Sequence, residues 1–307
     1  MERQLTDTIM MIRPSNFGYN QETAEDNAFQ SNDGAESVEE IVEIAKDEFD
    51  RFVDTLLNEG VRVHVIEDTP VPVKNDSVFP NNWISFHENG WVITYPMFSE
   101  MRRLERREDI VEDMMAHFQF NRRYSFEHYE ENELFLEGTG SLVLDRTHKI
   151  AYASLSVRTD VTILDKWAVL TGYRTQIFHG TDKTDQPIYH TNVLMAMGDE
   201  FVVICLDTIK DDEERNNIMD SFARTGKEVI HISYDQMEAY AGNMLQLNTP
   251  GGSIIVMSTQ AYNSLTDDQI IKISQYSKIV HSNIPVIEKY GGGSVRCMMA
   301  EVFYPVS

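Results

Sequence analysis

The sequence has few cysteines and few basic residues. Only two cysteines, Cys205 and Cys297, occur among 307 residues, and they lie far apart in the chain. A secreted domain usually has more cysteines in an even framework, so we expect a reducing compartment. The chain has 26 Lys and Arg against 50 Asp and Glu, a formal net charge of −24. This charge would repel a phosphate backbone or an anionic membrane, which argues against nucleic-acid and membrane partners.

Long apolar segments are also missing. No uninterrupted apolar run approaches the length of a membrane-spanning helix, and polar residues follow Met1 where a signal peptide would need an apolar core. We therefore expect a cytoplasmic protein. The hydrophobic fraction of 42% is ordinary and provides enough apolar material for a core. No linker or low-complexity tract divides the chain, so we expect a single catalytic domain over residues 1–307.

A weak internal repeat with a period of about 51 to 58 residues organises the chain. Segments typical of a β-hairpin, with short apolar runs bounded by Gly, Asn and Asp, begin near Asn82, Gly140, Asn192, Asn243 and Ser294. Helical patterns follow, over residues 37–59, 99–118, 161–171, 210–225 and 260–277. Most of these are followed by another short strand. The repeating unit is therefore hairpin, helix, strand.

Five ββαβ units predict an α/β ring with pseudo-five-fold symmetry. The fifth unit, from Ser294 to Pro305, lacks its helix and its last strand. The N-terminal strand Thr8–Arg13 and the helix at 37–59 could complete it and leave no open sheet edge. An open α/β sheet with irregular connections is the alternative. The polar, Asn- and Gly-rich loop at 18–35 is our candidate for the cover of the site.

The segments that lead into the hairpins would meet at the axis of such a ring. Among them, Cys297, His190 and Glu137 are the parts of a cysteine-nucleophile site. Cys297 follows three glycines, Gly291–Gly293, which let the backbone approach a ligand closely. A free thiol is mostly protonated at neutral pH, and His190 could serve as its base. Glu137 would fix the imidazole tautomer and stabilise the imidazolium. The plainer alternatives are a core histidine and a solvated carboxylate.

Four segments resemble the signatures of the guanidino-group-modifying (pentein) superfamily, which includes arginine deiminases and amidinotransferases: Phe79–Asn82, Leu136–Gly140, His190–Asn192 and Gly291–Cys297. They occur in the right order over nearly the whole chain, and the opening Ile12–Phe17 is similar to the branch described as citrulline-utilisation hydrolases. The resemblance implies a five-bladed α/β propeller with Cys297, His190 and Glu137 as catalytic triad. It also implies that Arg158 and Arg103 hold a substrate α-carboxylate. For Arg103, an exposed helix face is the alternative, because Arg102 and Arg106 are close.

Two asparagines predict a neutral substrate. Asn82 and Asn192 stand where typical arginine deiminases have aspartates, and a buried guanidinium without counter-charges is costly. A ureido group is neutral, and an amide offers both a donor and an acceptor for it. Asn192 and His190 would face the same side of an extended segment. We therefore predict that free citrulline, a small amino-acid substrate, is hydrolysed to ornithine, ammonia and carbon dioxide through an S-carbamoyl enzyme.

Several alternatives stay open at this point. An arginine or methylarginine deiminase or dihydrolase is the first rival, and a non-catalytic binding protein with the same ring fold is the second. No His-Glu-x-x-His or paired-cysteine motif occurs, so neither a metal nor another cofactor is expected. Cys205 lies in an apolar run and should pack as a small hydrophobe. The oligomeric state is not readable, a homo-oligomer included.

Overall fold

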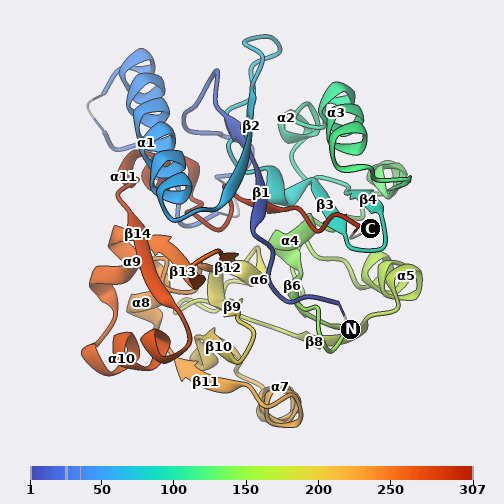
Figure 1. The fold of residues 1–307 in the computed structure, drawn as a ribbon, viewed down its shortest axis with the longest axis vertical. Coiled ribbons are helices and arrows are strands. Elements are labelled where there is room, and N and C mark those ends of the chain that lie inside the picture. Colours follow the sequence, from blue (N-terminus) through green and yellow to red (C-terminus); the bar gives the residue numbers. More distant parts are fainter. Residues whose placement is uncertain (1, 25–26, 35, 306–307) are drawn as a thin grey trace.

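The computed structural model describes residues 2–24, 27–34 and 36–305. The described residues form five three-stranded sheets. In each sheet two strands pair antiparallel, and the middle strand pairs parallel with a third strand that follows a helical connection. The larger helices lie at the outside, and the short helices α4 (Gly138–Ser141) and α6 (Thr191–Leu194) lie near the centre (Figure 1). The predicted five-bladed α/β propeller of ββαβ repeats is confirmed.

Blades 1 to 4 follow one another along the chain. In order, they consist of β3 (Ile84–His87), β4 (Trp91–Thr94), α2 (Glu100–Arg103), α3 (Glu108–Phe118) and β5 (Arg122–Ser125); β6 (Val143–Asp145), β7 (Ile150–Ser154), α5 (Val161–Thr171) and β8 (Arg174–Phe178); β9 (Met195–Met197), β10 (Phe201–Ile204), α7 (Asp212–Arg224) and β11 (Glu228–His231); and β12 (Leu245–Thr249), β13 (Gly252–Ser258), α9 (Thr259–Ser264), α10 (Asp267–Tyr276) and β14 (Lys278–Ser282). The remaining short elements are η1 (Pro80–Asn82), η2 (Glu127–Asn132), η3 (Leu206–Thr208), α8 (Tyr234–Glu238) and α11 (Pro285–Gly291).

Blade 5 joins the two ends of the chain. Strand β1 (Thr8–Arg13) pairs parallel with β2 (Arg62–Glu67), after α1 (Val38–Asn58), and antiparallel with β15 (Ala300–Glu301). The predicted closure by the N-terminal strand and helix is therefore confirmed. The expected hairpin at 294–305 is not local, because its second strand is β1.

The helices begin and end where their sequences dictate. Ser37 caps α1 in a capping box with Glu40, and the apolar stripe of that helix is buried against blade 5 and its neighbours. Two predicted helices are broken: that at 99–118 into α2 and α3, and that at 260–277 into α9 and α10, because Thr266 makes a new N-cap. No helix among the described residues has the length and apolar character needed to cross a bilayer.

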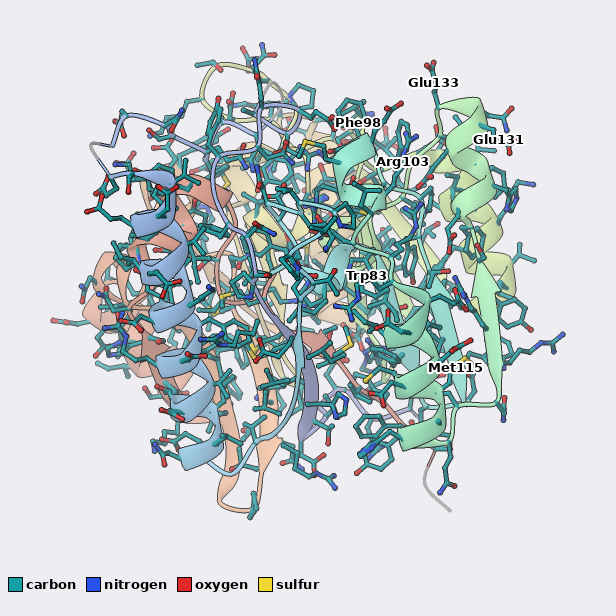
Figure 2. The ribbon with its side chains drawn as sticks, turned by 90° about the horizontal axis from the view of Figure 1, so that it is seen from above. Trp83, Phe98, Arg103, Met115, Glu131 and Glu133 are labelled. Atoms are coloured by element: carbon teal, nitrogen blue, oxygen red, sulfur yellow. The ribbon has the colours of Figure 1, made fainter. Side chains whose placement is uncertain are left out.

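The hydrophobic core lies between the sheets and the outer helices. Figure 2 shows Trp83 inside the molecule and the side chains of Glu131 and Glu133 at its rim. Trp83 is fully buried in a cluster with residues of β3, β4 and α3. Cys205 is also fully buried, in the largest apolar cluster, and burial raises the pKa of its thiol to about 12. These contacts agree with its predicted role as a small hydrophobe.

Candidate active site

The inner ends of the blades bring the three predicted triad residues together. Glu137 directly precedes α4, His190 is the N-cap of α6, and Cys297 lies in a turn after α11. His190 Nε2 lies 2.7 Å from Glu137 Oε2, and His190 and Cys297 line the same small pocket. None of the three side chains is more than 5% exposed. The arrangement is that of a shielded nucleophile with a base held by a carboxylate.

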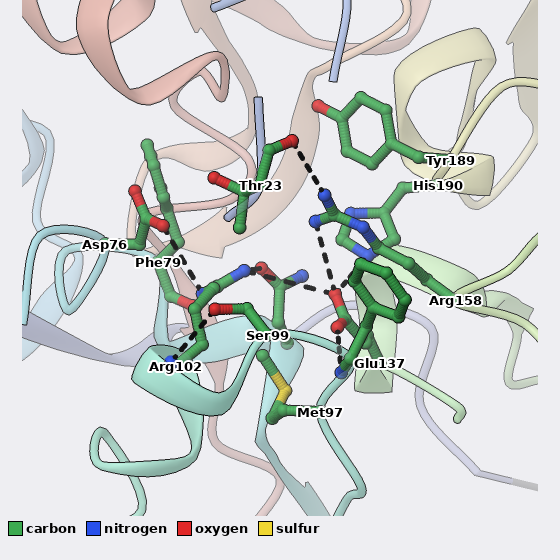
Figure 3. Close-up of polar contacts among 12 residues, drawn as sticks. Thr23, Asp76, Phe79, Met97, Ser99, Arg102, Glu137, Arg158, Tyr189 and His190 are labelled. Carbon is green, nitrogen blue, oxygen red and sulfur yellow. Dashed lines mark hydrogen bonds and ion pairs between the residues drawn. The ribbon is translucent and has the colours of Figure 1, made fainter. Parts of the chain in front are cut away.

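Charges around Glu137 decide the protonation states (Figure 3). Burial opposes ionisation of Glu137, but Arg158 and the hydrogen bond from His190 outweigh it and lower its pKa to about 2. An ionised carboxylate only accepts hydrogen bonds, so His190 Nε2 carries a proton and Nδ1 holds the lone pair of the neutral ring. Burial lowers the pKa of His190, although Glu137 opposes this. The neutral ring of His190 therefore has the lone pair of Nδ1 available to accept a proton.

Two amides contact the sulfur of Cys297. Nδ2 of Asn192 lies 3.5 Å from Cys297 Sγ, and Nδ2 of Asn243 lies 3.3 Å from it. The expected extended segment after His190 is wrong, because α6 begins at Thr191 and its turn directs Asn192 to the sulfur. Sequence reasoning marked Asn243 only as the start of a hairpin. Its place one repeat after Asn192 was the signal for a site residue.

Arg158 lies where the sequence predicted it, on the wall of the pocket. It is 2% exposed, and its Nη1 lies 3.7 Å from Glu137 Oε2. Nη2 donates to the backbone oxygen of Thr23 at 3.2 Å, and the guanidinium lies over the Tyr189 ring, 4.9 Å from its centroid.

The structure favours Arg102 over Arg103 as the second arginine of the site. Arg103 is not among the described residues that line the pocket; its Nε donates to Met97 O at 3.0 Å, and its guanidinium lies near Phe135 and Glu130. Arg102 lines the pocket and is 3% exposed. Successive side chains point in different directions on a helix, so only one of the two can face the axis. The spacing of arginines in the sequence could not show which.

Arg102 fixes the orientation of the Asn82 amide. Its Nε and Nη2 bind Glu105 at 2.9 and 3.0 Å, and its Nη1 donates to Asn82 Oδ1 at 2.9 Å. Because arginine only donates, the oxygen of Asn82 must face it and Nδ2 must face the other way. A Cβ on Gly140 would lie 2.4 Å from Asn82 Nδ2 and 2.9 Å from His190 Nδ1, so both nitrogens pack against Gly140 and lie near each other. Asn82 Nδ2 has no hydrogen-bond partner among the described residues.

Asp76 is a pocket residue that sequence reasoning missed. It is 2% exposed, its Oδ2 accepts from Asn20 Nδ2 at 2.7 Å, and Arg102 Nε lies 3.9 Å away. Its Oδ1 has no hydrogen-bond partner within the described ranges. Burial raises the pKa of Asp76, and Arg102 opposes this shift. Nothing in the sequence separated this carboxylate from the other acidic residues.

The loop at 18–35, our candidate for the cover of the site, borders the pocket. Thr23 and Asn27 line it, and Asn27 Nδ2 and Gln30 Nε2 donate to the oxygens of Gly292 and Gly291 at 3.3 and 3.1 Å. Residues 25, 26 and 35 of this loop lie outside the described residues. No group of three or more His, Cys, Asp and Glu in the described part of the chain could hold a metal ion.

Two buried carboxyls support the segment that carries Cys297. Glu48 accepts from the first backbone amides of α11, Val286 N and Ile287 N, at 3.0 and 2.9 Å. Glu288 accepts from Ser294 Oγ at 2.7 Å, three residues before the nucleophile. Burial raises the pKa of each carboxyl to about 7.

A ring of five ββαβ blades with Cys, His and Glu at its axis defines the pentein class of guanidino-group-modifying enzymes. Solved structures support this class. The arginine dihydrolase ArgZ of the ornithine-ammonia cycle in cyanobacteria matches with a TM-score of 0.76 and 16% identity over 98% of this chain and 41% of that chain. The ArgZ N-terminal domain bound covalently to a reaction intermediate matches with a TM-score of 0.75 and 16% identity, over 97% of this chain and 98% of that chain. A dimethylarginine dimethylaminohydrolase adduct with S-methyl-L-thiocitrulline matches with a TM-score of 0.64 and 13% identity, over 97% and 99%.

A comparison of the sequence with protein-family models assigns the chain to one family within this class. The family model of eukaryotic N,N dimethylarginine dimethylhydrolases matches residues 13–304, so the chain belongs to this family. A search of curated protein sequences finds no match. The chain spans about two fifths of full-length ArgZ.

Substitution of the two neighbouring arginines tests which of them serves the site. We expect Arg102→Met to lower kcat/KM at least about a hundredfold, since it frees the Asn82 amide and leaves Glu105 without its buried partner. Arg103→Met should change kcat/KM by less than about threefold, because its contacts lie outside the pocket. Steady-state kinetics on both variants, with circular dichroism to verify folding, measure the difference. A larger loss for Arg103→Met would reverse the assignment.

The raised pKa of Glu288 predicts a pH-dependent stability. Its folded-state pKa lies near 7, above its ordinary value of 4.5, so its contribution is complete at low pH and is lost as pH rises through 7. Glu288→Gln keeps a neutral side chain at every pH. Between pH 5 and 8 the unfolding free energy of the variant should therefore gain up to about 3 kcal/mol relative to the native protein. Urea unfolding at pH 5 and pH 8 measures this difference in unfolding free energy, and Glu131→Gln, at an exposed position, is the control. If the unfolding free energies of Glu288→Gln and the native protein changed equally with pH, the prediction would be contradicted.

Proposed function

We propose that the protein is a cysteine-dependent hydrolase that converts free citrulline to ornithine, ammonia and carbon dioxide. The observation that carries the proposal is the fixed Asn82 amide, whose Nδ2 donor is unsatisfied beside His190. A ureido oxygen can accept from this donor. A guanidinium has only donors, so it would oppose one N–H with another and leave the buried amide unpaired. Asn192 Oδ1, which has no hydrogen-bond partner among the described residues, offers an acceptor for a ureido N–H.

The pocket wall also suits a free amino acid. Arg158 presents a guanidinium for an α-carboxylate, and Asp76 presents an unpaired carboxylate oxygen for an α-ammonium. Opposite charges at separate points of one wall match a zwitterion. The loop at 18–35 supplies polar backbone and side-chain groups next to both, through Thr23 and Asn20.

The proposed reaction uses Cys297 and His190 in turn. The Cys297 thiol passes its proton to His190 Nδ1, and the thiolate adds to the ureido carbon while Asn82 donates to the developing oxyanion. The imidazolium, stabilised by Glu137, returns the proton to the departing nitrogen as the C–N bond breaks, which leaves a carbamoyl thioester. Neutral His190 then takes a proton from a water whose oxygen attacks the carbamoyl carbon. The C–S bond breaks, and carbamate decomposes to ammonia and carbon dioxide.

Arginine or a methylated arginine is the second candidate substrate. Asp76 supports it, because a carboxylate inside the pocket could offset a guanidinium in place of the missing aspartates. The matched structures include an arginine dihydrolase and a dimethylarginine dimethylaminohydrolase, which also favours a guanidino substrate.

Parallel product analysis on citrulline, arginine, methylarginine and agmatine separates the candidates. We expect kcat/KM for citrulline to exceed that for arginine by about tenfold or more, since one unpaired buried donor costs about 1–3 kcal/mol. Ornithine and ammonia are quantified together, and citrulline release reports a deiminase. Cys297→Ala is the control and should abolish turnover of any true substrate. A preference for arginine would overturn the citrulline assignment.

Asn82→Asp provides a matched test of the same argument. The variant keeps the size of the side chain and its contact with Arg102, but replaces the orphaned donor with an acceptor. Citrulline turnover should fall, and the arginine-to-citrulline ratio of kcat/KM should rise about tenfold or more. An unchanged ratio would show that the Asn82 amide does not select the substrate.

A further inference from the structure

Asn243, at the start of the blade 4 hairpin, is a buried polar residue that the proposed reaction does not use. Asn243 is 2% exposed, and its Nδ2 lies 3.3 Å from Cys297 Sγ and 3.0 Å from the backbone oxygen of Asn192. Its Oδ1 accepts from the backbone N–H of Arg296 at 3.1 Å. Asn243 therefore contacts the sulfur of Cys297, the backbone of Arg296 directly before it, and the backbone of Asn192, whose side chain is the other amide on the sulfur.

These contacts leave only one orientation for the Asn243 amide. The Arg296 N–H can only donate, so it must meet Oδ1, and the Asn192 carbonyl can only accept, so it must meet Nδ2. An amide nitrogen has two hydrogens. One serves the Asn192 oxygen, and the other is directed at Cys297 Sγ, which can only accept it. The donor to sulfur is thus fixed by two backbone groups.

A cysteine nucleophile needs stabilisation of its anion, and the site offers little positive charge for this. Burial lowers the pKa of His190, and although Glu137 opposes this shift, the guanidinium groups of Arg158 and Arg102 add to it. Those arginines are paired with Glu137 and Glu105. Hydrogen bonds to the charged form of a group favour that form, and two amide donors reach this sulfur.

We propose that Asn243 is a catalytic residue whose side-chain N–H, together with that of Asn192, holds the sulfur of Cys297 as a thiolate. The proton lost from sulfur passes to His190 Nδ1, and no other bond changes in this step. The amides of Asn243 and Asn192 also hold the Cys297 side chain in the pocket when His190 is neutral. The inference rests on the proposed cysteine nucleophile, and it is independent of whether the substrate is citrulline or arginine.

Alkylation of Cys297 by iodoacetamide tests the inference without any substrate. At pH 7 we expect Asn243→Ala to lower the alkylation rate about tenfold, the effect of one hydrogen bond to a charged group. Asn243→Asp should lower it further, because a carboxylate repels the thiolate. At pH 10, where base ionises the thiol unaided, the rates of the variants should approach that of the native protein. Mass spectrometry separates Cys297 from buried Cys205.

Asn248→Ala is the matched control, an exposed asparagine on β12 of the same blade, and should leave the alkylation profile unchanged. If Asn243→Ala does not fold, Asn243→Ser and Asn192→Ala probe the same pair of donors. A rate at pH 7 equal to that of the native protein, or an equal loss at pH 7 and pH 10, would overturn the inference. Absent citrulline turnover with the expected alkylation profile would instead reject the proposed substrate and keep the role of Asn243.

Discussion

The ionised carboxylate of Glu137 is the interaction on which the site depends. It has no exposed surface, and it stays charged because His190, Arg158 and Arg102 surround it. Through its bond to Nε2 it sets the tautomer of His190, which leaves Nδ1 as the basic atom. It also neutralises part of the charge of Arg158, so that this arginine can lie in a buried wall. Loss of this one negative charge would leave the buried guanidinium of Arg158 without the carboxylate that it faces.

The ring fold supplies this site by giving it side chains from each blade. Blade 1 contributes Asn82, blade 2 Glu137, blade 3 His190, blade 4 Asn243 and blade 5 Cys297. No two of these blades could form the site alone. Closure of the ring by β1 and β15 therefore matters for chemistry as well as for stability, since the nucleophile lies three residues before β15 and its position depends on that pairing.

The repeat and the triad could be predicted from the sequence because both leave a periodic signal. Hairpins recur at a nearly constant spacing, and Glu137, His190 and Cys297 each stand close to the start of a hairpin unit. Asn243 stands at such a position too, but an asparagine before a hairpin is also an ordinary turn residue. The one-turn helices before the strands could not be predicted, since four residues contain no helical period.

Other features of the site depend on side-chain orientations that the amino-acid sequence does not show. Arg102 and Arg103 are adjacent and identical in type, and only the path of α2 decides which one meets Glu105 and the axis. Asp76 lies ahead of the first hairpin in a polar stretch, and its burial follows from the packing of the 18–35 loop through Asn20. Only tertiary contacts distinguish these site residues from the other arginines and acidic residues of the chain.

The charge balance of the pocket connects the fold to the choice of substrate. Each of the two buried arginines already has a carboxylate partner, Glu105 for Arg102 and Glu137 for Arg158, and Asp76 is shared between Arg102 and Asn20. A zwitterionic amino acid with a neutral end group adds one charge of each sign, which leaves that balance unchanged. A guanidinium adds a net cation and must draw Asp76 away from Arg102 to offset it. Within the described residues, the amides of Asn82 and Asn192 each present one polar atom without a hydrogen-bond partner, a donor and an acceptor respectively, and the proposed ureido substrate would pair with both.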